Sequence, residues 1–433
     1  MKVKFAHLSD VHLGAWRNEK LNELGYKAFE ETVNSIIKEE VDFVVISGDL
    51  YDVSNPKVEV IDVATRELKK LKDHEISVYG ICGSHDFSPS NKSMIRPLIT
   101  AGLFIDVSKG ELMENGKKLK LNFYQDQKTQ IKITGLRARK RSLEIEDYQI
   151  LDIESLESEK GPKIFILHTM LSELKPKEYK DMKSAPKSLL PQDFDYYAGG
   201  HLHKTLPEKL RVKEFFYDIN QKNNIVYSGC IFPTDFREFE TIKFGGFCII
   251  SGESSGNKLN LKVKYVPVKV IEVENVSLNC TNKSASDVQN LLKQEISKKN
   301  LNEKIVTVRI YGPLSSGKTY EIKSNEIIQN LKDMGAFEVL VNKNALTTVA
   351  YQSISVSAGK SKEEIEATLI KEHASKVRIS DFPSAKMENK IYQLLNTLGI
   401  ERQVGTKVMN YNESLKQSFL GIFEIQKSKE LKQ

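Results

Sequence analysis

The first half of the chain alternates short apolar runs with segments whose apolar residues recur at helical spacing. Residues 43–46 are wholly apolar and residues 3–8 and 76–81 mostly so, which is typical of buried strands. Between these runs, the spacing predicts helices near 28–38 and 58–71. Further strands are predicted at 131–134, 164–167, 196–198 and 225–227. Strands that alternate with helices in this way predict a layered α/β fold.

The pattern changes near residue 266. A second, smaller α/β unit is predicted from strands at 268–273, 305–310 and 337–341 and helices at 285–298 and 325–334. Residues 351–362 are rich in Ser, Lys and Gly and are typical of a linker. We therefore expect four parts, with the boundaries 1–266, 267–345, 346–380 and 381–433, the third of which is a linker with a short helix.

The last part carries two apolar stripes at helical spacing, which predict a pair of amphipathic helices. The first stripe ends before Gly399. The stripes consist of Ile391, Leu394, Leu395 and Leu398, and of Leu415, Phe419, Ile422 and Phe423.

Length and composition narrow the class of protein. A chain of 433 residues, 40% apolar and 28% charged, has room for two or three folded domains. No apolar run reaches the roughly 18 residues of a membrane helix, and the N-terminus lacks the apolar core of a signal peptide. The four cysteines are far apart without a CxxC pair, which excludes a zinc ribbon and argues against a disulfide framework. We expect a cytoplasmic protein without a membrane partner; a net charge of +6 is compatible with nucleic acid.

Five short segments share one design, in which residues that commonly bind metals follow an apolar strand. Five of the eight histidines lie in them. The segments are Asp10-Val11-His12, Gly48-Asp49-Leu50-Tyr51-Asp52, Gly83-Ser84-His85-Asp86, His168, and Gly199-Gly200-His201-Leu202-His203. Strand ends in layered α/β folds open onto one crevice, and residues i and i+2 of an extended segment point the same way. Imidazole together with carboxylate suits manganese, iron or zinc.

Each of these motifs has an ordinary explanation when it is taken alone. A lone D-x-H is more often a pair of surface polar residues, and a lone GDxxD is usually a turn. An isolated H-x-H is ambiguous. The ordered set of all five is far more specific, and it predicts a dinuclear phosphoesterase site.

The set resembles the calcineurin-like metallophosphoesterase superfamily and, more narrowly, the archaeal type of the meiotic-recombination-eleven nuclease family, whose bacterial relative is SbcD. The resemblance spans roughly residues 1–250. It is carried by residues 9–14 (SDVHLG), 47–52 (SGDLYD), 198–204 (AGGHLHK) and 227–234 (YSGCIFPT). It implies a four-layer αββα metallophosphoesterase sandwich, with a small α/β cap domain that faces DNA and a C-terminal helical hairpin.

The resemblance also implies a role for each residue of the motifs. Asp10, His12, Asp49 and His203 match the ligands of the first metal, and Asp49 would bridge to a second metal bound by Ser84, His168 and His201. His85 matches the catalytic histidine beside the phosphate, with Asp52 to orient it and Asp86 as a second candidate for that role. Ser84 departs from the asparagine usual in the family, so the second site is expected to be weaker. The implied cofactors are two Mn²⁺ ions per chain, which in such sites lie roughly 3.5–4 Å apart and clamp the phosphodiester.

The resemblance implies DNA and a Rad-fifty-type ABC ATPase as partners, and a homodimer. The C-terminal helices would bind the ATPase, although packing on this chain's own nuclease domain is the alternative. Candidate contacts to DNA phosphates are Arg17, Arg137, Arg139 and Lys140, for which a solvated surface is the alternative. Trp16 could guide a DNA end or simply cover the core.

Residues 312–319 match the P-loop pattern GxxxxGK[ST], but no helix is predicted to begin at the Gly-Lys-Thr, so we expect an ordinary loop. The function expected is a manganese-dependent DNA exonuclease and endonuclease of double-strand-break repair. Two rivals remain open. One is a metallophosphatase or nucleotide phosphodiesterase, and the other is a catalytically weak DNA-end tether.

Overall fold

The computed structural model describes residues 2–88, 92–211, 216–220, 223–255, 258–348, 366, 369–370, 384–400 and 408–423. Two compact units make up the chain. The first comprises Met1–Leu278, Asn290–Ile310 and Lys323–Asn344, and the second comprises Asn279–Gln289, Tyr311–Ile322 and Ala345–Gln433.

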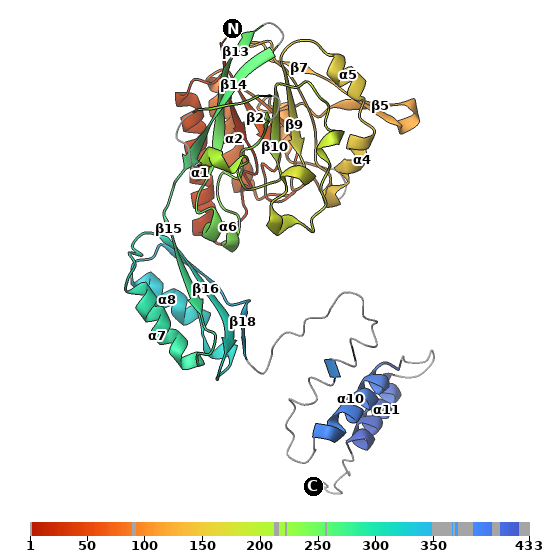
Figure 1. Ribbon diagram of the computed structural model, residues 1–433, viewed down its shortest axis with the longest axis vertical. Coiled ribbons are helices and arrows are strands. Elements are labelled where there is room, and N and C mark those ends of the chain that lie inside the picture. The colour runs from red at the N-terminus through yellow and green to blue at the C-terminus, as the bar shows by residue number, and fades with distance from the viewer. Residues whose placement is uncertain are drawn as a thin grey trace. The chain divides into compact units, whose positions relative to one another are not determined.

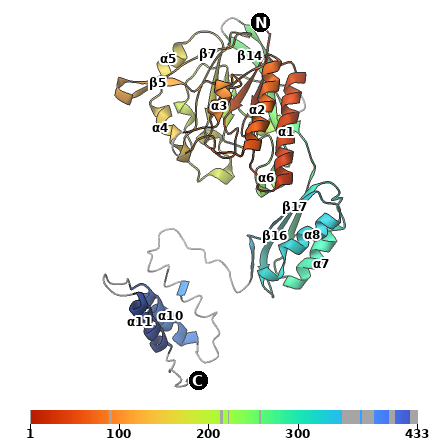
Figure 2. The same cartoon turned by 180° about the vertical axis from the view of Figure 1, so that it is seen from behind.

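A seven-stranded sheet forms one half of a sandwich in the first unit. Its order is β11-β14-β13-β1-β2-β3-β4. The strands are β1 (Lys2–Leu8), β2 (Phe43–Ser47), β3 (Ser77–Ile81), β4 (Ile105–Asp106), β11 (Tyr217–Asp218), β13 (Gly245–Ser255) and β14 (Lys258–Val268). Strands β1 to β4 are parallel, and β13 pairs antiparallel with β1. Helices α1 (Glu19–Lys38), α2 (Val58–Asp73) and α3 (Ile95–Thr100) cover one face, where α1 and α2 lie side by side (Figure 2).

A five-stranded sheet forms the other half, in the order β12-β10-β9-β8-β7. Its strands are β7 (Tyr124–Gln125), β8 (Lys132–Leu136), β9 (Lys163–His168), β10 (Tyr196–Gly200) and β12 (Ile225–Tyr227). Helices α4 (Glu144–Gln149) and α5 (Ile153–Ser158) cover its outer face, away from α1 and α2 (Figure 1). The layers are therefore helix, sheet, sheet, helix, which confirms the predicted four-layer sandwich.

The apolar runs in the sequence are explained by burial on both faces of a sheet. Phe5 and Phe43 point into the space between the two sheets, where their rings stack 4.9 Å apart. Ala6 and Val44, one position along, point into the core beneath the helices. Because successive side chains alternate between faces, such a strand needs apolar residues at every position.

The remaining elements form smaller groups. A four-stranded sheet contains β15 (Val273–Asn279), β16 (Ile305–Leu314), β17 (Glu338–Asn342) and β18 (Leu346–Thr348), and α7 (Ala285–Ile296) and α8 (Ser324–Asp333) accompany it in the chain. A hairpin of β5 (Gly110–Met113) and β6 (Lys118–Leu121) and the helix α6 (Phe236–Thr241) belong to the first unit. Short 3₁₀ turns occur at Glu114–Gly116, Lys140–Ser142, Ser172–Leu174, Lys177–Tyr179, Lys187–Leu189, Glu208–Arg211 and Thr319–Glu321.

Most predicted elements agree with the structure to within about two residues at each end, and the two largest differences lie at 268–273 and at the start of α1. The strand predicted at 268–273 is wrong, because β14 ends at Val268 and β15 begins at Val273, so these residues form the connection. Helix α1 begins nine residues before the predicted start, at Glu19, because the side chain of Asn18 caps it by accepting the backbone N–H of Leu21.

The two predicted C-terminal helices are present as α10 (Ser384–Leu398) and α11 (Val408–Ile422), which pack on each other. The predicted linker at 351–362 lies outside the described residues. Within the part of the chain that the structure describes, no helix combines the length and the apolar character needed to cross a membrane.

Candidate metal centre

The metal-type residues of the five segments meet where strands of both sheets end. Asp10 follows β1, Asp49 follows β2, Ser84 follows β3, His168 ends β9 and His201 follows β10. Backbone hydrogen bonds join the first two loops, with the N–H of Asp10 donating to Gly48 O and that of His12 to Asp49 O. The topology therefore brings together side chains that are up to about 190 residues apart in sequence.

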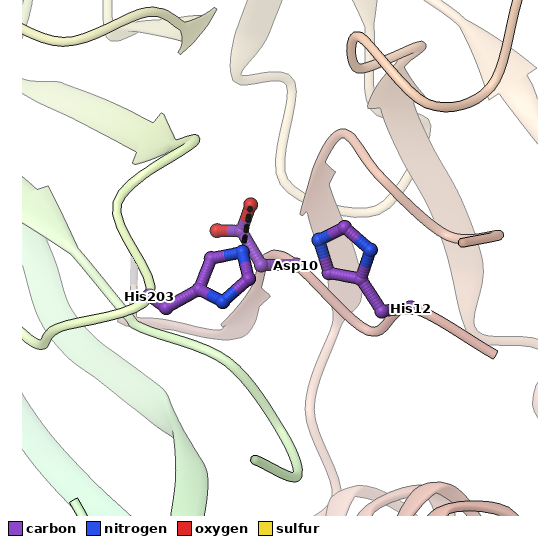
Figure 3. Close-up of side chains that lie close together, drawn as sticks. All are labelled: Asp10, His12 and His203. Carbon is purple, nitrogen blue, oxygen red and sulfur yellow. Dashed lines mark ion pairs between the residues drawn. The ribbon is translucent and has the colours of Figure 1, made fainter. Parts of the chain in front are cut away.

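Among the described residues, four groups of side chains have the composition of metal sites, and two of them share Asp10. Asp10, His12 and His203 form one group (Figure 3), and Asp10, Asp49 and His168 form the other, each with ligand atoms within 4.8 Å of one another. Asp49 Oδ2 lies 3.1 Å from His168 Nε2 and 3.7 Å from His12 Nε2. Asp49 therefore contacts His12 of the first group and His168 of the second, as a bridging ligand would, and Asp10 belongs to both groups.

Three of the candidate ligand histidines have Nδ1 within hydrogen-bond distance of an oxygen atom. The partners are Asp52 Oδ1 for His12 at 3.2 Å, Ser47 O for His168 at 2.7 Å and Glu238 Oε1 for His203 at 2.6 Å. Such a bond fixes the ring and leaves Nε2 to bind a metal.

The opposite nitrogens face the carboxylate of Asp49. Among the described residues, Nε2 of His12 and Nε2 of His168 are buried and make no hydrogen bond beyond their ion pairs with Asp49 Oδ2, at 3.7 and 3.1 Å. Buried polar atoms with so few partners require an explanation. A divalent cation that binds both nitrogen and oxygen ligands would give these two nitrogens a partner, because they lie beside the carboxylates of Asp10 and Asp49.

Opposite charges in the cluster shift the pKa values of its members in opposite directions. Burial alone would raise the pKa of Asp49, but His168, His12 and His85 outweigh it and hold this pKa well below its usual range. Burial lowers the pKa of His168, yet Asp49 more than offsets this and the pKa rises to about 10. Burial is the largest single effect on the pKa of His203 and lowers it, but the hydrogen bond to Glu238 and the charges of Glu238, Asp10 and Asp49 together outweigh burial, so this pKa rises to about 9. Without a cation, these histidines are therefore protonated at neutral pH.

The backbone is strained at several of the candidate ligands. Asp10, His12, Asp49 and His201 have φ of 50°, 47°, 52° and 85°, in the left-handed region that residues other than glycine rarely adopt. Strain of this kind persists only where the surrounding structure enforces it, and it concentrates at functional sites.

Asp86 connects the loops that carry the candidate ligands. Its carboxylate accepts the backbone N–H groups of Gly83 at 2.8 Å, Asp49 at 2.9 Å and Tyr51 at 3.0 Å. Gly83 allows this approach, because a Cβ there would lie 2.2 Å from Oδ1 of Asp49. Burial and the charge of Asp49 raise the pKa of Asp86 to about 7. The sequence suggested that Asp86 orients His85. In the structure, the Asp86 carboxylate instead accepts hydrogen bonds from these three backbone amides.

His85 is oriented differently from the prediction. Its Nδ1 lies 2.5 Å from the backbone oxygen of Asp52, while the Asp52 carboxylate supports His12. The His85 ring is exposed and lies 4.8 Å from the His12 ring. Asp52 therefore contacts both histidines, one through its main chain and one through its side chain.

Ser84 and His201 lie at the edge of the cluster. Ser84 Oγ is 3.5 Å from Asp49 Oδ2, and the His201 ring is 5.3 Å from the His168 ring. The backbone N–H of His201 donates to both oxygens of Asp10 at 3.1 and 3.2 Å. Burial, followed by the nearby His168, lowers the pKa of His201 to about 4, so this ring is neutral.

The candidate DNA-contacting residues differ in availability. Arg17 and Lys140 are exposed, and the guanidinium of Arg137 lies 4.9 Å above the ring of Phe87, close to His85 in the chain. Arg139 pairs with Asp147 at 3.0 Å, so its charge is already compensated. Trp16 donates its ring N–H to Pro233 O and packs against Phe239, which fits the interpretation that it covers the core.

The loop that matches a P-loop does not have the P-loop structure. Helix α8 begins only at Ser324, after a three-residue 3₁₀ turn. The carboxylate of Glu321 accepts the backbone N–H of Lys318 at 3.1 Å, which places a negative charge where a phosphate would need to bind.

Glu238 is a residue of the site that the sequence analysis missed. Asp235 caps α6 by accepting the N–H of Glu238, a spacing that signals a helix start but says nothing of His203, 35 residues away. Only the neighbouring segment 227–234, which resembles the turn that follows the site, pointed to this region.

Comparison with known proteins agrees with the site. Residues 3–205 match the family model described as calcineurin-like phosphoesterase. The chain is 26% identical over 336 residues to a "DNA double-strand break repair protein Mre11" of Methanococcus maripaludis, covering 76% of this chain and 79% of that one. It is 32% identical over 209 residues to the protein of that name from Sulfurisphaera tokodaii, covering 47% and 49%. A third, from Sulfolobus acidocaldarius, is 30% identical over 203 residues, covering 46% and 50%, so the chain spans about half the length of these last two relatives.

Proposed function

We propose that this chain is a manganese-dependent DNA nuclease that cleaves phosphodiesters at DNA ends in double-strand-break repair, a proposal supported by the match of residues 3–205 to the calcineurin-like phosphoesterase family. The observation that carries the proposal is the meeting of two ligand groups that share Asp10, with the buried Nε2 atoms of His12 and His168 both directed at Asp49. The names of the relatives supply the substrate class, since they are repair proteins that act on broken DNA.

The ligand assignment is part of the proposal. Asp10, His12, Asp49 and His203 hold the first Mn²⁺, and Asp49, Ser84, His168 and His201 hold the second. When bound, such ions supply Lewis-acid stabilisation of the charge that develops on the phosphodiester oxygens.

The chain's own residues supply proton transfer and orientation. With Nδ1 of His85 committed to the carbonyl of Asp52, Nε2 is the nitrogen that exchanges a proton with the leaving oxygen. Asp52 and Glu238 keep the rings of His12 and His203 fixed through their Nδ1 atoms. Asp86 fixes the loop of Asp49 by accepting the backbone N–H of Asp49. The loop of His85 is joined to it, because the His85 N–H donates to Asp49 Oδ1 at 2.7 Å.

The rest of the chain serves the substrate and the partner. We propose a nuclease domain at 1–266, a DNA-facing cap at 267–345, a linker at 346–380 and a segment at 381–433 that binds a Rad-fifty-type ABC ATPase. Arg17, Arg137 and Lys140 are the preferred contacts to DNA phosphates, because Arg139 is paired with Asp147. The active form is a homodimer.

The test is cleavage by the purified chain with Mn²⁺, with Mg²⁺ and with EDTA. The substrates are an end-labelled DNA duplex and p-nitrophenyl phosphate, a monoester. We expect Mn²⁺-dependent shortening of the duplex and little monoester hydrolysis. Efficient hydrolysis of the monoester would favour a phosphatase, and DNA binding without any cleavage would favour a tether.

A further inference from the structure

Helix α6 contacts the metal centre through Glu238. One oxygen of this carboxylate lies 2.6 Å from His203 Nδ1, and the other accepts the backbone N–H and the hydroxyl of Thr234 at 2.7 and 3.0 Å. Both oxygens are thus fixed, so any movement of the helix is passed directly to the His203 ring.

The same helix is attached to strand β16 by an ion pair. Nε of Arg309 lies 2.8 and 3.0 Å from the two carboxylate oxygens of Glu240, and the guanidinium lies 5.1 Å above the ring of Phe236. A guanidinium that contacts both oxygens fixes orientation as well as distance. Two α6 side chains therefore hold one arginine of the sheet.

Strand β15 adds a second attachment, to the main chain of α6. The side-chain amide of Asn275 donates to Glu240 O at 2.9 Å, and its oxygen accepts the hydroxyl of Thr307, on β16, at 2.8 Å. The helix end is therefore held by two neighbouring strands at once.

A third side of α6 faces the segment that follows His12. The buried ring of Phe239 lies 5.4 Å from that of Trp16, which in turn donates to Pro233 O just before the helix. Glu238 and Glu240 are two positions apart, about 200° around a helix, so they face opposite sides. A helix of six residues is too short to be stable by itself, and its position is set by these contacts.

We propose that α6 is the element through which strands β15 and β16 set the orientation of His203, with Glu238 as the positioning residue and the Arg309–Glu240 pair as the link to the sheet. This inference rests on the proposed function, because it concerns the same metal centre. It makes metal affinity and turnover depend on contacts made by a sheet that contains none of the proposed ligands.

The test is a double-mutant cycle of Arg309→Gln and Glu240→Gln, together with the charge-exchanged pair Arg309→Glu with Glu240→Arg. Each full-length variant is titrated with Mn²⁺ by calorimetry and assayed on bis-p-nitrophenyl phosphate, a diester too small to need the sheet for binding. Lys304→Gln is the matched control, since Lys304 pairs with Glu272 at 2.8 Å just before β16.

We expect both single variants to weaken Mn²⁺ binding several-fold and to lower kcat with KM little changed. The double variant should lose no more than either single one, and the exchanged pair should regain part of the loss. Glu238→Gln should weaken Mn²⁺ binding roughly 10–100-fold, as is usual for a group that supports a ligand histidine. Lys304→Gln should match the unmodified chain.

Lower melting temperatures with unchanged Mn²⁺ affinity and kcat would overturn the inference, because the pair would then serve stability alone. Independent, additive losses in the cycle would overturn it as well. An unmodified chain that binds no Mn²⁺ would overturn the proposed function and this inference together, so the two failures are distinguishable.

Discussion

The metal centre and the C-terminal helices show opposite departures from the usual rule of burial. At the metal centre, charged groups are hidden from water: Asp10, Asp49 and His168 are 0%, 2% and 1% exposed. On α10 and α11, apolar groups face water: Leu398 and Phe419 are 58% and 43% exposed. Both departures cost free energy unless something compensates them.

The difference between the two regions indicates which kind of ligand would compensate each one. Asp49 Oδ2 lies close to the buried Nε2 atoms of His12 and His168, and a small cation is a group that such ligand atoms can share. The stripe on α10 and α11 extends over several helical turns, which only a macromolecular surface can cover. Substitutions in the first region should therefore change the chemistry, and substitutions in the second should change association alone.

The largest effect on cleavage is expected from His85→Ala. Loss of a general acid typically lowers the rate roughly 10²–10⁴-fold. Mn²⁺ binding should persist, because His85 contacts Asp49 through its backbone N–H, which alanine retains. Cleavage of labelled duplex and calorimetric titration with Mn²⁺ measure the two properties separately.

His74→Ala is the control, since His74 is an exposed histidine at the end of α2. Mn²⁺-dependent cleavage by the His85 variant at the rate of the control would remove this residue from the proposed chemistry.

The next effect concerns His7, a buried group behind the metal centre that no cation compensates. Its Nδ1 and Nε2 lie 2.9 Å from Tyr196 Oη and Ser47 Oγ, and burial lowers its pKa from 6.5 to about 3. Below pH 6.5 the unfolded chain therefore binds a proton at His7 that the folded chain does not bind. The contribution of neutral His7 to the free energy of unfolding is present above pH 6.5 and is lost as the pH falls towards 3. Between pH 7.5 and 5 this amounts to about 2 kcal/mol.

His7→Gln should be less stable at pH 7.5 but should lose less stability on acidification. Denaturant unfolding at the two pH values checks this, with His74→Gln as the exposed control. An acid dependence as steep as that of the unmodified chain would show that other groups control it.

Much of the fold could be predicted because both faces of the sandwich strands are buried. Residues 43–46 had to be apolar throughout, and this pattern identifies a strand directly. The β13–β14 hairpin was missed and the connection at 268–273 was misread as a strand. The alternation of β14 continues through Val270 and Ile271 into β15, with no glycine to mark the break.

Sequence patterns predicted the candidate ligands of the site but not the groups that orient them. The ligand candidates could be found because each follows a strand in a recognisable motif. The groups behind them could not, since Glu238 reaches His203 only through the tertiary fold. Likewise, Asp52 contacts His85 through a backbone oxygen, which no side-chain motif encodes.

A smaller effect is expected from Ser84→Asn. Ser84 Oγ lies 3.5 Å from Asp49 Oδ2, and an asparagine side chain reaches further and offers a carbonyl oxygen, a better neutral ligand than a hydroxyl. The second Mn²⁺ should bind more tightly, as a calorimetric titration would reveal. Ser84→Ala is the control, and equal affinity of all three chains would mean that position 84 supplies no ligand.

The smallest effect on cleavage, none at all, is expected from Phe419→Glu, although its effect on association should be large. Phe419 is exposed on α11, and its ring lies 4.9 Å from that of Phe423. Burying one such side chain in a partner contributes roughly 1.5–3 kcal/mol, or about tenfold to hundredfold in Kd, and a buried carboxylate adds a further penalty.

Ser418→Glu places the same charge on the neighbouring exposed position and serves as the control. Capture by the ATPase should fail for Phe419→Glu alone, with Mn²⁺-dependent cleavage and the melting temperature of the sandwich unchanged. A sharp fall in that melting temperature would instead mean that the stripe packs on its own chain, and the contrast between the two regions would then lose its explanation.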